Sequence, residues 1–115
     1  METIKTIVIS SDDEYATRFY QRLLNSTYRI IQYQEKYGEM QLNQADILLV
    51  DHRANGQDLR LVRKVRDSHP ELPVVSITSM LDAFPAEMKV VTLTKPVSLD
   101  SLLETVKDLI GGYRK

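Results

Sequence analysis

The chain has 115 residues, of which 43% are hydrophobic and 27% are charged, and its formal net charge is −1. This length and balance predict one soluble globular domain spanning 1–115. The chain has no cysteine, which excludes disulfides and thiolate metal sites and is typical of a reducing cytosol, so we expect a cytoplasmic protein. A charge near zero offers no bulk attraction to nucleic acid, and no apolar run approaches the ~20 residues of a membrane span.

The predicted elements alternate between strand and helix along the chain. Short apolar runs predict five strands, at 6–10, 28–33, 47–50, 74–77 and 90–93. Helical spacing of apolar residues predicts helices at 14–25, 58–68 and 99–110, and a helix of about two turns fits near 38–44. This order predicts an α/β fold with a doubly wound, five-stranded parallel sheet and helices on both of its faces.

The segment between the last two predicted strands is unusually short. A crossover between parallel strands normally takes a dozen or more residues, usually with a helix. Only ten residues lie between Thr78 and Lys89, and Pro85 interrupts them. We therefore expect no full helix in this segment, only a short turn at Met80–Phe84.

Polar side chains follow four of the predicted strands, at the point where each strand ends. They are Asp12 and Asp13 after the first strand, Asp51 after the third, Thr78 after the fourth and Lys95 after the fifth. Open α/β sheets bind their ligands at the carboxyl ends of the strands. We therefore expect these side chains to lie together at one edge of the sheet.

These strand exits, with Lys95-Pro96 and the helix that follows, resemble the receiver domain of two-component response regulators from about Lys5 to Ile110. The resemblance implies a flavodoxin-like sheet in the order 2-1-3-4-5. It also implies a signalling module rather than an enzyme with turnover. In receivers, an aspartate at the position of Asp51 accepts a phosphoryl group from a histidine kinase or a phosphotransfer protein.

The resemblance also implies roles for the neighbouring residues. Lys95 would pair with a phosphoryl oxygen, Thr78 would donate a hydrogen bond to another, and the Lys95-Pro96 bond would be cis. The implied cofactor is Mg²⁺, which prefers oxygen ligands. Its implied ligands are the carboxylates of Asp12, Asp13 and Asp51 and the main-chain carbonyl of Arg53.

The chain departs from the family's pattern at several positions. The family's two consecutive acids after the first strand correspond either to Ser11 and Asp12 or, shifted by one residue, to Asp12 and Asp13. The first alternative removes one charge and predicts weaker Mg²⁺ binding. The aromatic switch position of the last strand is Thr92. These departures favour an alternative function, a pseudo-receiver that works by protein contact alone.

The last strand is expected to lie at the edge of the sheet, beside a segment too short to cover it well. We therefore expect Val90, Val91 or Leu93 to be partly exposed. Exposed strand edges and apolar patches attract partners. The region of the last strand and last helix is thus predicted to form a homodimer or output-partner surface, although Lys89 and Lys95 oppose edge pairing.

The remaining charged and titratable residues suggest no further site. The basic residues of the 58–68 helix are expected to form its solvated face: Arg60, Arg63, Lys64 and Arg66. His52 and His69 lie in predicted loops with no partner at ligand spacing. Neither histidine is therefore expected to be a metal ligand or a catalytic base.

Overall fold

The computed structural model describes residues 4–52, 57–79 and 84–111. Its elements in chain order are β1 (Thr6–Ser11), α1 (Glu14–Leu24), β2 (Arg29–Gln32), the 3₁₀ turn η1 (Glu35–Tyr37), α2 (Gly38–Gln44), β3 (Ile47–Asp51), α3 (Gln57–Ser68), β4 (Val74–Thr78), the 3₁₀ turn η2 (Ala86–Met88), β5 (Val90–Thr94) and α4 (Leu99–Ile110). Every predicted strand and helix is present, and its ends differ from the prediction by no more than one residue. The turn predicted at Met80–Phe84 lies largely outside the described residues.

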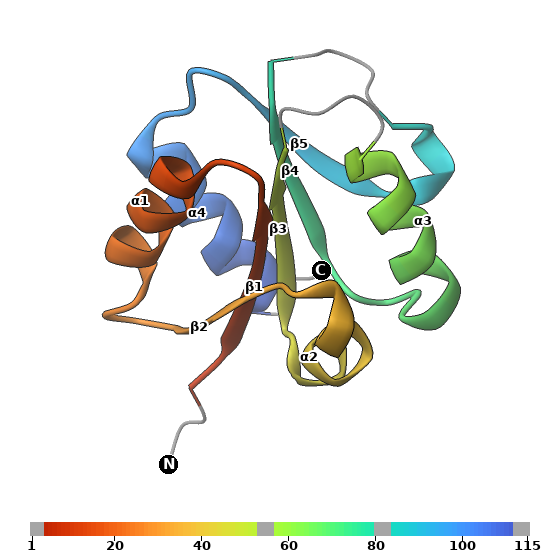
Figure 1. The fold of residues 1–115 in the computed structure, drawn as a ribbon. Helices are drawn as coiled ribbons and strands as arrows, with labels where there is room; N and C mark the ends of the chain where they lie inside the picture. The colour runs from red at the N-terminus through yellow and green to blue at the C-terminus, as the bar shows by residue number, and fades with distance from the viewer. Residues whose placement is uncertain (1–3, 53–56, 80–83, 112–115) are drawn as a thin grey trace.

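The five strands form one parallel sheet in the predicted order β2-β1-β3-β4-β5. All strands run in the same direction, so their carboxyl ends meet at one edge. The register places Ser11 beside Asp51 and Thr78 beside Thr94 at that edge. In Figure 1, α1 and α4 lie on one face of the sheet, and α2 and α3 lie on the other.

Alternate residues of each strand point to opposite faces, so the strands contribute side chains to two separate hydrophobic cores. On the α1/α4 face, Ile7, Ile9, Ile47 and Leu49 pack with Tyr20 and Leu24 of α1 and with Leu102 and Val106 of α4. On the α2/α3 face, Val8, Leu48 and Val50 pack with Leu42 of α2 and with Val62 and Val65 of α3. The near-continuous apolar runs of the sequence are therefore strands that are covered on both sides.

Between β4 and β5 the described residues contain no α-helix, only the turn η2. Arg66 of α3 reaches this region and donates to main-chain oxygens, from Nε to Met88 at 2.6 Å and from Nη1 to Leu72 at 2.7 Å. The prediction that Arg66 belongs to a solvated face is therefore wrong. Its guanidinium donates to carbonyl groups on both sides of β4, at Leu72 before the strand and at Met88 after it, and its burial lowers the pKa of Arg66.

β5 is an edge strand, as β2 is, and neither of these two strands has a buried residue. Val91 is 37% exposed, and Val90 and Leu93 are half-buried, which confirms the predicted partial exposure. Leu99 and Leu103 of α4 are also exposed. No helix in the described part of the chain is long and apolar enough to cross a membrane.

Candidate functional site

Asp51, the last residue of β3, is a carboxylate that is only 1% exposed. It follows Leu49 by two residues and so points to the α1/α4 face. The Lys95 ammonium donates to Oδ1 of Asp51 at 2.8 Å. The Tyr20 hydroxyl donates to Oδ2 at 2.5 Å. Both carboxylate oxygens therefore have donors, which offsets the cost of burying the group.

Lys95 reaches Asp51 from the end of β5, two strands away. Its main-chain N–H donates to the carbonyl oxygen of Thr78 at 2.8 Å, which holds the exits of β4 and β5 together. The Lys95-Pro96 peptide bond is cis, as expected. The predicted proximity of Asp51 and Lys95 is confirmed, whereas the roles of these residues and of Thr78 in phosphoryl transfer stay predictions.

Tyr20 is the residue at this site that the sequence pattern did not indicate. It is spaced as a core residue of α1, and it is only 4% exposed. Burial, reinforced by the hydrogen bond to Asp51 and by the charges of Asp51 and Asp13, raises the pKa of Tyr20 above its usual value. The phenol is therefore neutral at physiological pH and acts as a donor. The only signal in the sequence is general: a buried tyrosine needs a partner for its hydroxyl.

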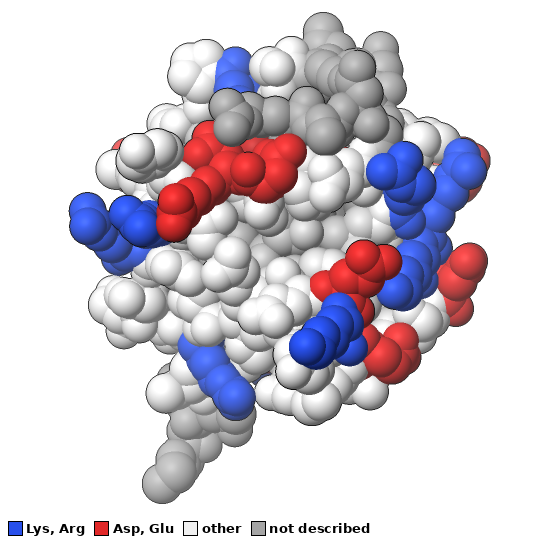
Figure 2. All heavy atoms as spheres, in the orientation of Figure 1, with Lys and Arg blue, Asp and Glu red and all other residues white. Residues whose placement is uncertain are grey.

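Asp13 is engaged at the start of α1. Its Oδ1 accepts the main-chain N–H groups of Tyr15 at 3.0 Å and Ala16 at 3.3 Å, so Asp13 is the N-cap of the helix. Figure 2 shows an acidic surface where β1 leads into α1.

The donor chemistry at this edge suits Mg²⁺ only in part. Asp12 is exposed and follows Ser11, which lies beside Asp51 in the sheet, and carboxylate oxygens are ligands that Mg²⁺ takes. Within residues 4–52, 57–79 and 84–111, however, no three acidic, histidine or cysteine side chains converge as a metal cluster. The expected ligand Arg53 lies outside the described residues. A cation at Asp51 would also compete with Tyr20 and Lys95 for the same two oxygens.

A second polar cluster lies on the opposite face of the sheet. His52 follows Asp51 and so points toward α3, where its Nε2 lies 2.9 Å from the Ser10 hydroxyl and its Nδ1 contacts Oδ1 of Asp58. His52 therefore has two side-chain partners, which spacing along the sequence did not indicate. Its partners come from β1 and α3, and their approach depends on the folded sheet rather than on sequence spacing.

Solved structures resemble this chain over nearly its whole length. A CheY-like response regulator receiver domain protein from Methanospirillum hungatei aligns with a TM-score of 0.80 at 20% identity, over 96% of each chain. The N-terminal signal receiver domain of a two-component system response regulator from Bacteroides fragilis aligns with a TM-score of 0.78 at 21% identity, over 94% of this chain and 98% of that chain. This chain has the receiver fold.

The receiver fold also occurs in a receiver-modulated diguanylate cyclase from Pelobacter carbinolicus. That structure aligns with a TM-score of 0.75 at 21% identity, over 95% of this chain and 94% of that chain. No protein-family model and no curated protein sequence matches the chain. The receiver fold is therefore identified from the structure, and the function of this chain rests on its own residues.

Proposed function

We propose that the chain is a phosphoacceptor receiver domain of two-component signalling. Asp51 takes the phosphoryl group from a histidine kinase or a phosphotransfer protein, and through this group the domain acts as a signalling module. The observation that supports this most is the contact between Asp51 and Lys95, 44 residues apart, at the carboxyl edge of the sheet. This edge is where open α/β sheets place their ligands.

The proposed transfer makes one bond and breaks one. A carboxylate oxygen of Asp51 attacks the phosphorus atom, the O–P bond forms, and the N–P bond to the donor histidine breaks. The Lys95 ammonium already donates to the Asp51 carboxylate. In the transfer it pairs with one phosphoryl oxygen, and the Thr78 hydroxyl donates a hydrogen bond to another. Such transfers need positioning and charge neutralisation more than covalent help from the protein.

Asp12 and Asp51 are the residues that would hold Mg²⁺, which supplies positive charge between the acceptor and the phosphoryl oxygens. Asp13 would have to join them through Oδ2, since its Oδ1 caps α1. Without Asp13 as a ligand, the Mg²⁺ site would carry fewer negative charges. We therefore propose weak, millimolar-range Mg²⁺ binding in the absence of a phosphoryl group.

Tyr20 links the state of Asp51 to α1 in this proposal. An ionised carboxylate accepts the Tyr20 hydrogen bond strongly, and esterification by a phosphoryl group removes the charge of that carboxylate. Phosphorylation therefore weakens the contact between β3 and α1. The residue that senses phosphorylation in this proposal is therefore Tyr20 of α1. In the family's pattern that residue is an aromatic of the last strand, and the corresponding position of β5 holds Thr92.

The test is incubation with acetyl phosphate and Mg²⁺, followed by intact-mass measurement. The wild type should gain one phosphoryl group, and the gain should require Mg²⁺. Asp51→Asn keeps the shape of the side chain but is a poor nucleophile, so it should gain none. An equal adduct on Asp51→Asn would contradict the assignment of the acceptor.

A pseudo-receiver is the second candidate, and two observations favour it. Tyr20 already occupies one oxygen of Asp51, and Ser11 stands where an acid would add charge for a metal. Under this alternative, the wild type stays unmodified in the same experiment although it is folded. The domain would then signal through protein contact alone.

A further inference from the structure

The cluster on the α3 face joins a hydroxyl, an imidazole and a carboxylate in a line. Ser10 of β1 lies 2.9 Å from Nε2 of His52, and Nδ1 of His52 contacts Oδ1 of Asp58 in α3. The His52 side chain is 5% exposed and the Asp58 side chain is 16% exposed. This order of groups is the one that activates a serine in unrelated hydrolytic folds, where it is recognised by geometry rather than by sequence position.

The carboxylate fixes the direction of proton movement in this line. A carboxylate accepts hydrogen bonds, so contact with Asp58 places the hydrogen of a neutral His52 ring on Nδ1. Nε2 is then the free acceptor, and it faces the Ser10 hydroxyl. Ser10 and the imidazole are both largely buried, so little water competes for this contact.

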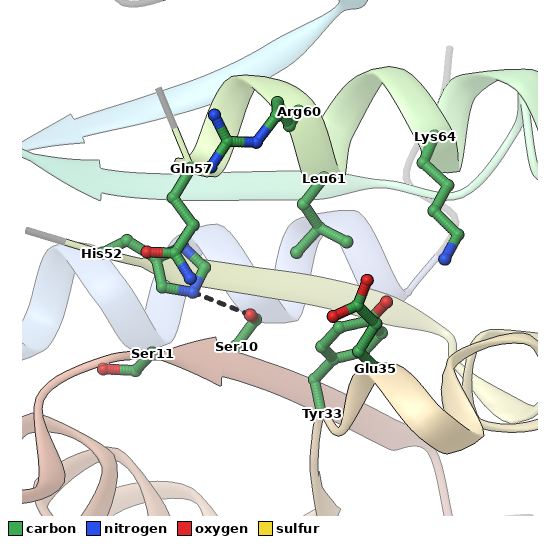
Figure 3. A pocket seen from close by; sticks show the side chains of 9 residues that line it. All are labelled: Ser10, Ser11, Tyr33, Glu35, His52, Gln57, Arg60, Leu61 and Lys64. Carbon is green, nitrogen blue, oxygen red and sulfur yellow. Dashed lines mark hydrogen bonds between the residues drawn. The ribbon is translucent and has the colours of Figure 1, made fainter. Parts of the chain in front are cut away.

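The line of groups opens into a pocket. A cavity of about 480 Å³ is lined by Ser10 and His52 together with Ser11, Tyr33, Glu35, Gln57, Arg60, Leu61 and Lys64. This volume lies within the range of small-molecule sites. In Figure 3, Gln57, Arg60 and Lys64 extend from α3, and the Gln57 side chain points down toward His52 and Ser10.

The charges of the pocket favour an anionic ligand. Arg60 and Lys64 are exposed and lie one turn apart on α3, and neither side chain has a hydrogen-bond or ion-pair partner among the described residues. The single acidic residue of the lining is Glu35, so cations exceed carboxylates at the rim. A ligand with one carboxylate or phosphate group would neutralise this excess.

We propose that Ser10 is a nucleophile, that His52 is its general base and that Asp58 positions His52. The substrate class is a small ester that carries an anionic group. Ser10 Oγ attacks the ester carbonyl and its proton passes to Nε2 of His52. The ester C–O bond breaks, the alcohol leaves with that proton, and the acyl group stays on Ser10 until water attacks through the same base. This site is independent of Asp51, which lies on the other face of the sheet.

The chain offers a natural comparison for this serine. Ser68 also lies near a histidine, with its Oγ 2.8 Å from Nδ1 of His69. The other ring nitrogen of His69 faces the side-chain oxygen of Asn43 at 2.8 Å rather than a hydrogen-bonded carboxylate. Ser68 is exposed and does not line the pocket. If proximity to an imidazole alone were enough to activate a serine, Ser68 should react as Ser10 does.

The test uses a fluorophosphonate probe, which leaves a phosphonate on an activated serine and releases fluoride. Tandem mass spectrometry of the full chain should locate the adduct on Ser10 and not on Ser68. His52→Gln should lower the rate of adduct formation by about 100-fold or more, the usual contribution of a general base. Ser68→Ala is the matched control, since Ser68 neither lines the pocket nor contacts His52, and it should react at the wild-type rate.

Two further measurements test the role of Asp58 and the substrate class separately. Asp58→Asn should slow adduct formation, and Asp58→Glu should recover part of the rate if a carboxylate positions the ring. Turnover of p-nitrophenyl succinate should exceed that of p-nitrophenyl acetate, and Arg60→Met with Lys64→Met should remove the preference.

Circular dichroism checks that each variant folds, and Asp51→Asn should keep full reactivity. The proposal is overturned if the folded wild type stays unlabelled, if Ser68 reacts as fast as Ser10, or if folded His52→Gln reacts at the wild-type rate.

Discussion

The Tyr20→Phe substitution tests the contact that the structure places on the buried carboxylate. The change removes only the hydroxyl, which donates to Oδ2 of Asp51 at 2.5 Å, and leaves the ring in its core position. Hydrogen bonds to charged groups contribute about 1.5–3 kcal/mol. Asp51 is 1% exposed, so water does not replace the lost donor. We expect Tyr20→Phe to lower the free energy of unfolding by about 2 kcal/mol at pH 7.

The pH dependence of that loss has a definite sign. The pKa of Tyr20 is raised in the folded protein, chiefly by burial, above the value of about 10 that it has when unfolded. Above pH 10 the unfolded chain therefore releases a proton that the folded chain keeps, so the stability contributed by Tyr20 is present below pH 10 and is lost as pH rises. The difference between wild type and Tyr20→Phe should shrink by about 1.4 kcal/mol between pH 9 and pH 11.

Urea unfolding followed by circular dichroism measures both effects. Tyr15→Phe is the matched control, because Tyr15 lies in the same helix and is 81% exposed, and it should change the stability little. In an Asp51→Asn background the effect of Tyr20→Phe should fall well below its wild-type value. Equal losses for Tyr15→Phe and Tyr20→Phe, or full additivity with Asp51→Asn, would refute the reasoning.

Three further substitutions test other contacts. Lys95→Met should lower the free energy of unfolding by about 1–2 kcal/mol, since it leaves Asp51 without its cation, and should slow phosphorylation by acetyl phosphate at least about tenfold. Arg66→Met should lower the free energy of unfolding by about 2 kcal/mol in urea unfolding, because the main-chain oxygens of Leu72 and Met88 lose their donor. Ser76→Ala should raise the free energy of unfolding by about 1 kcal/mol, since the buried Ser76 hydroxyl has no hydrogen-bond partner among the described residues.

Exposed residues of the same type serve as controls for the two cation substitutions. Lys107 on α4 and Arg63 on α3 are exposed, so Lys107→Met and Arg63→Met should change stability by less than about 0.5 kcal/mol. If Arg63→Met costs as much as Arg66→Met, the crossover does not depend on the Arg66 contacts. A loss of stability in Ser76→Ala would show that its hydroxyl has a partner in solution.

The elements were predictable because each one satisfies local rules. Apolar runs predicted the five strands, and Ser98, of a residue type that favours helix starts, caps α4 by accepting the Ser101 N–H at 3.0 Å. The strand exits followed from the parallel sheet, so the contact of Asp51 with Lys95 could be anticipated. The lack of a helix between β4 and β5, in the part that the structure describes, agrees with the short spacing.

The other polar contacts could not be predicted from the sequence, because they depend on how the helices and strands approach one another in space. Tyr20 and Asp51 are 31 residues apart, and Ser10 and His52 are 42 residues apart. Tyr20 shares the helical spacing of an ordinary core residue. Arg66 shares the spacing of a solvated residue, yet its long side chain reaches main-chain oxygens near η2. Helical period sets the direction of a side chain, whereas partners depend on tertiary packing.

The most direct test of the central claim locates the phosphoryl group chemically. The protein is incubated with acetyl phosphate and Mg²⁺ and then reduced with borohydride, which converts an aspartyl phosphate to homoserine and leaves free carboxylates intact. Peptide mass spectrometry should find homoserine at position 51 in the wild type, and only when the phosphoryl donor and Mg²⁺ are both present. An unreduced Asp51 in folded protein, or homoserine at another aspartate, would contradict the account.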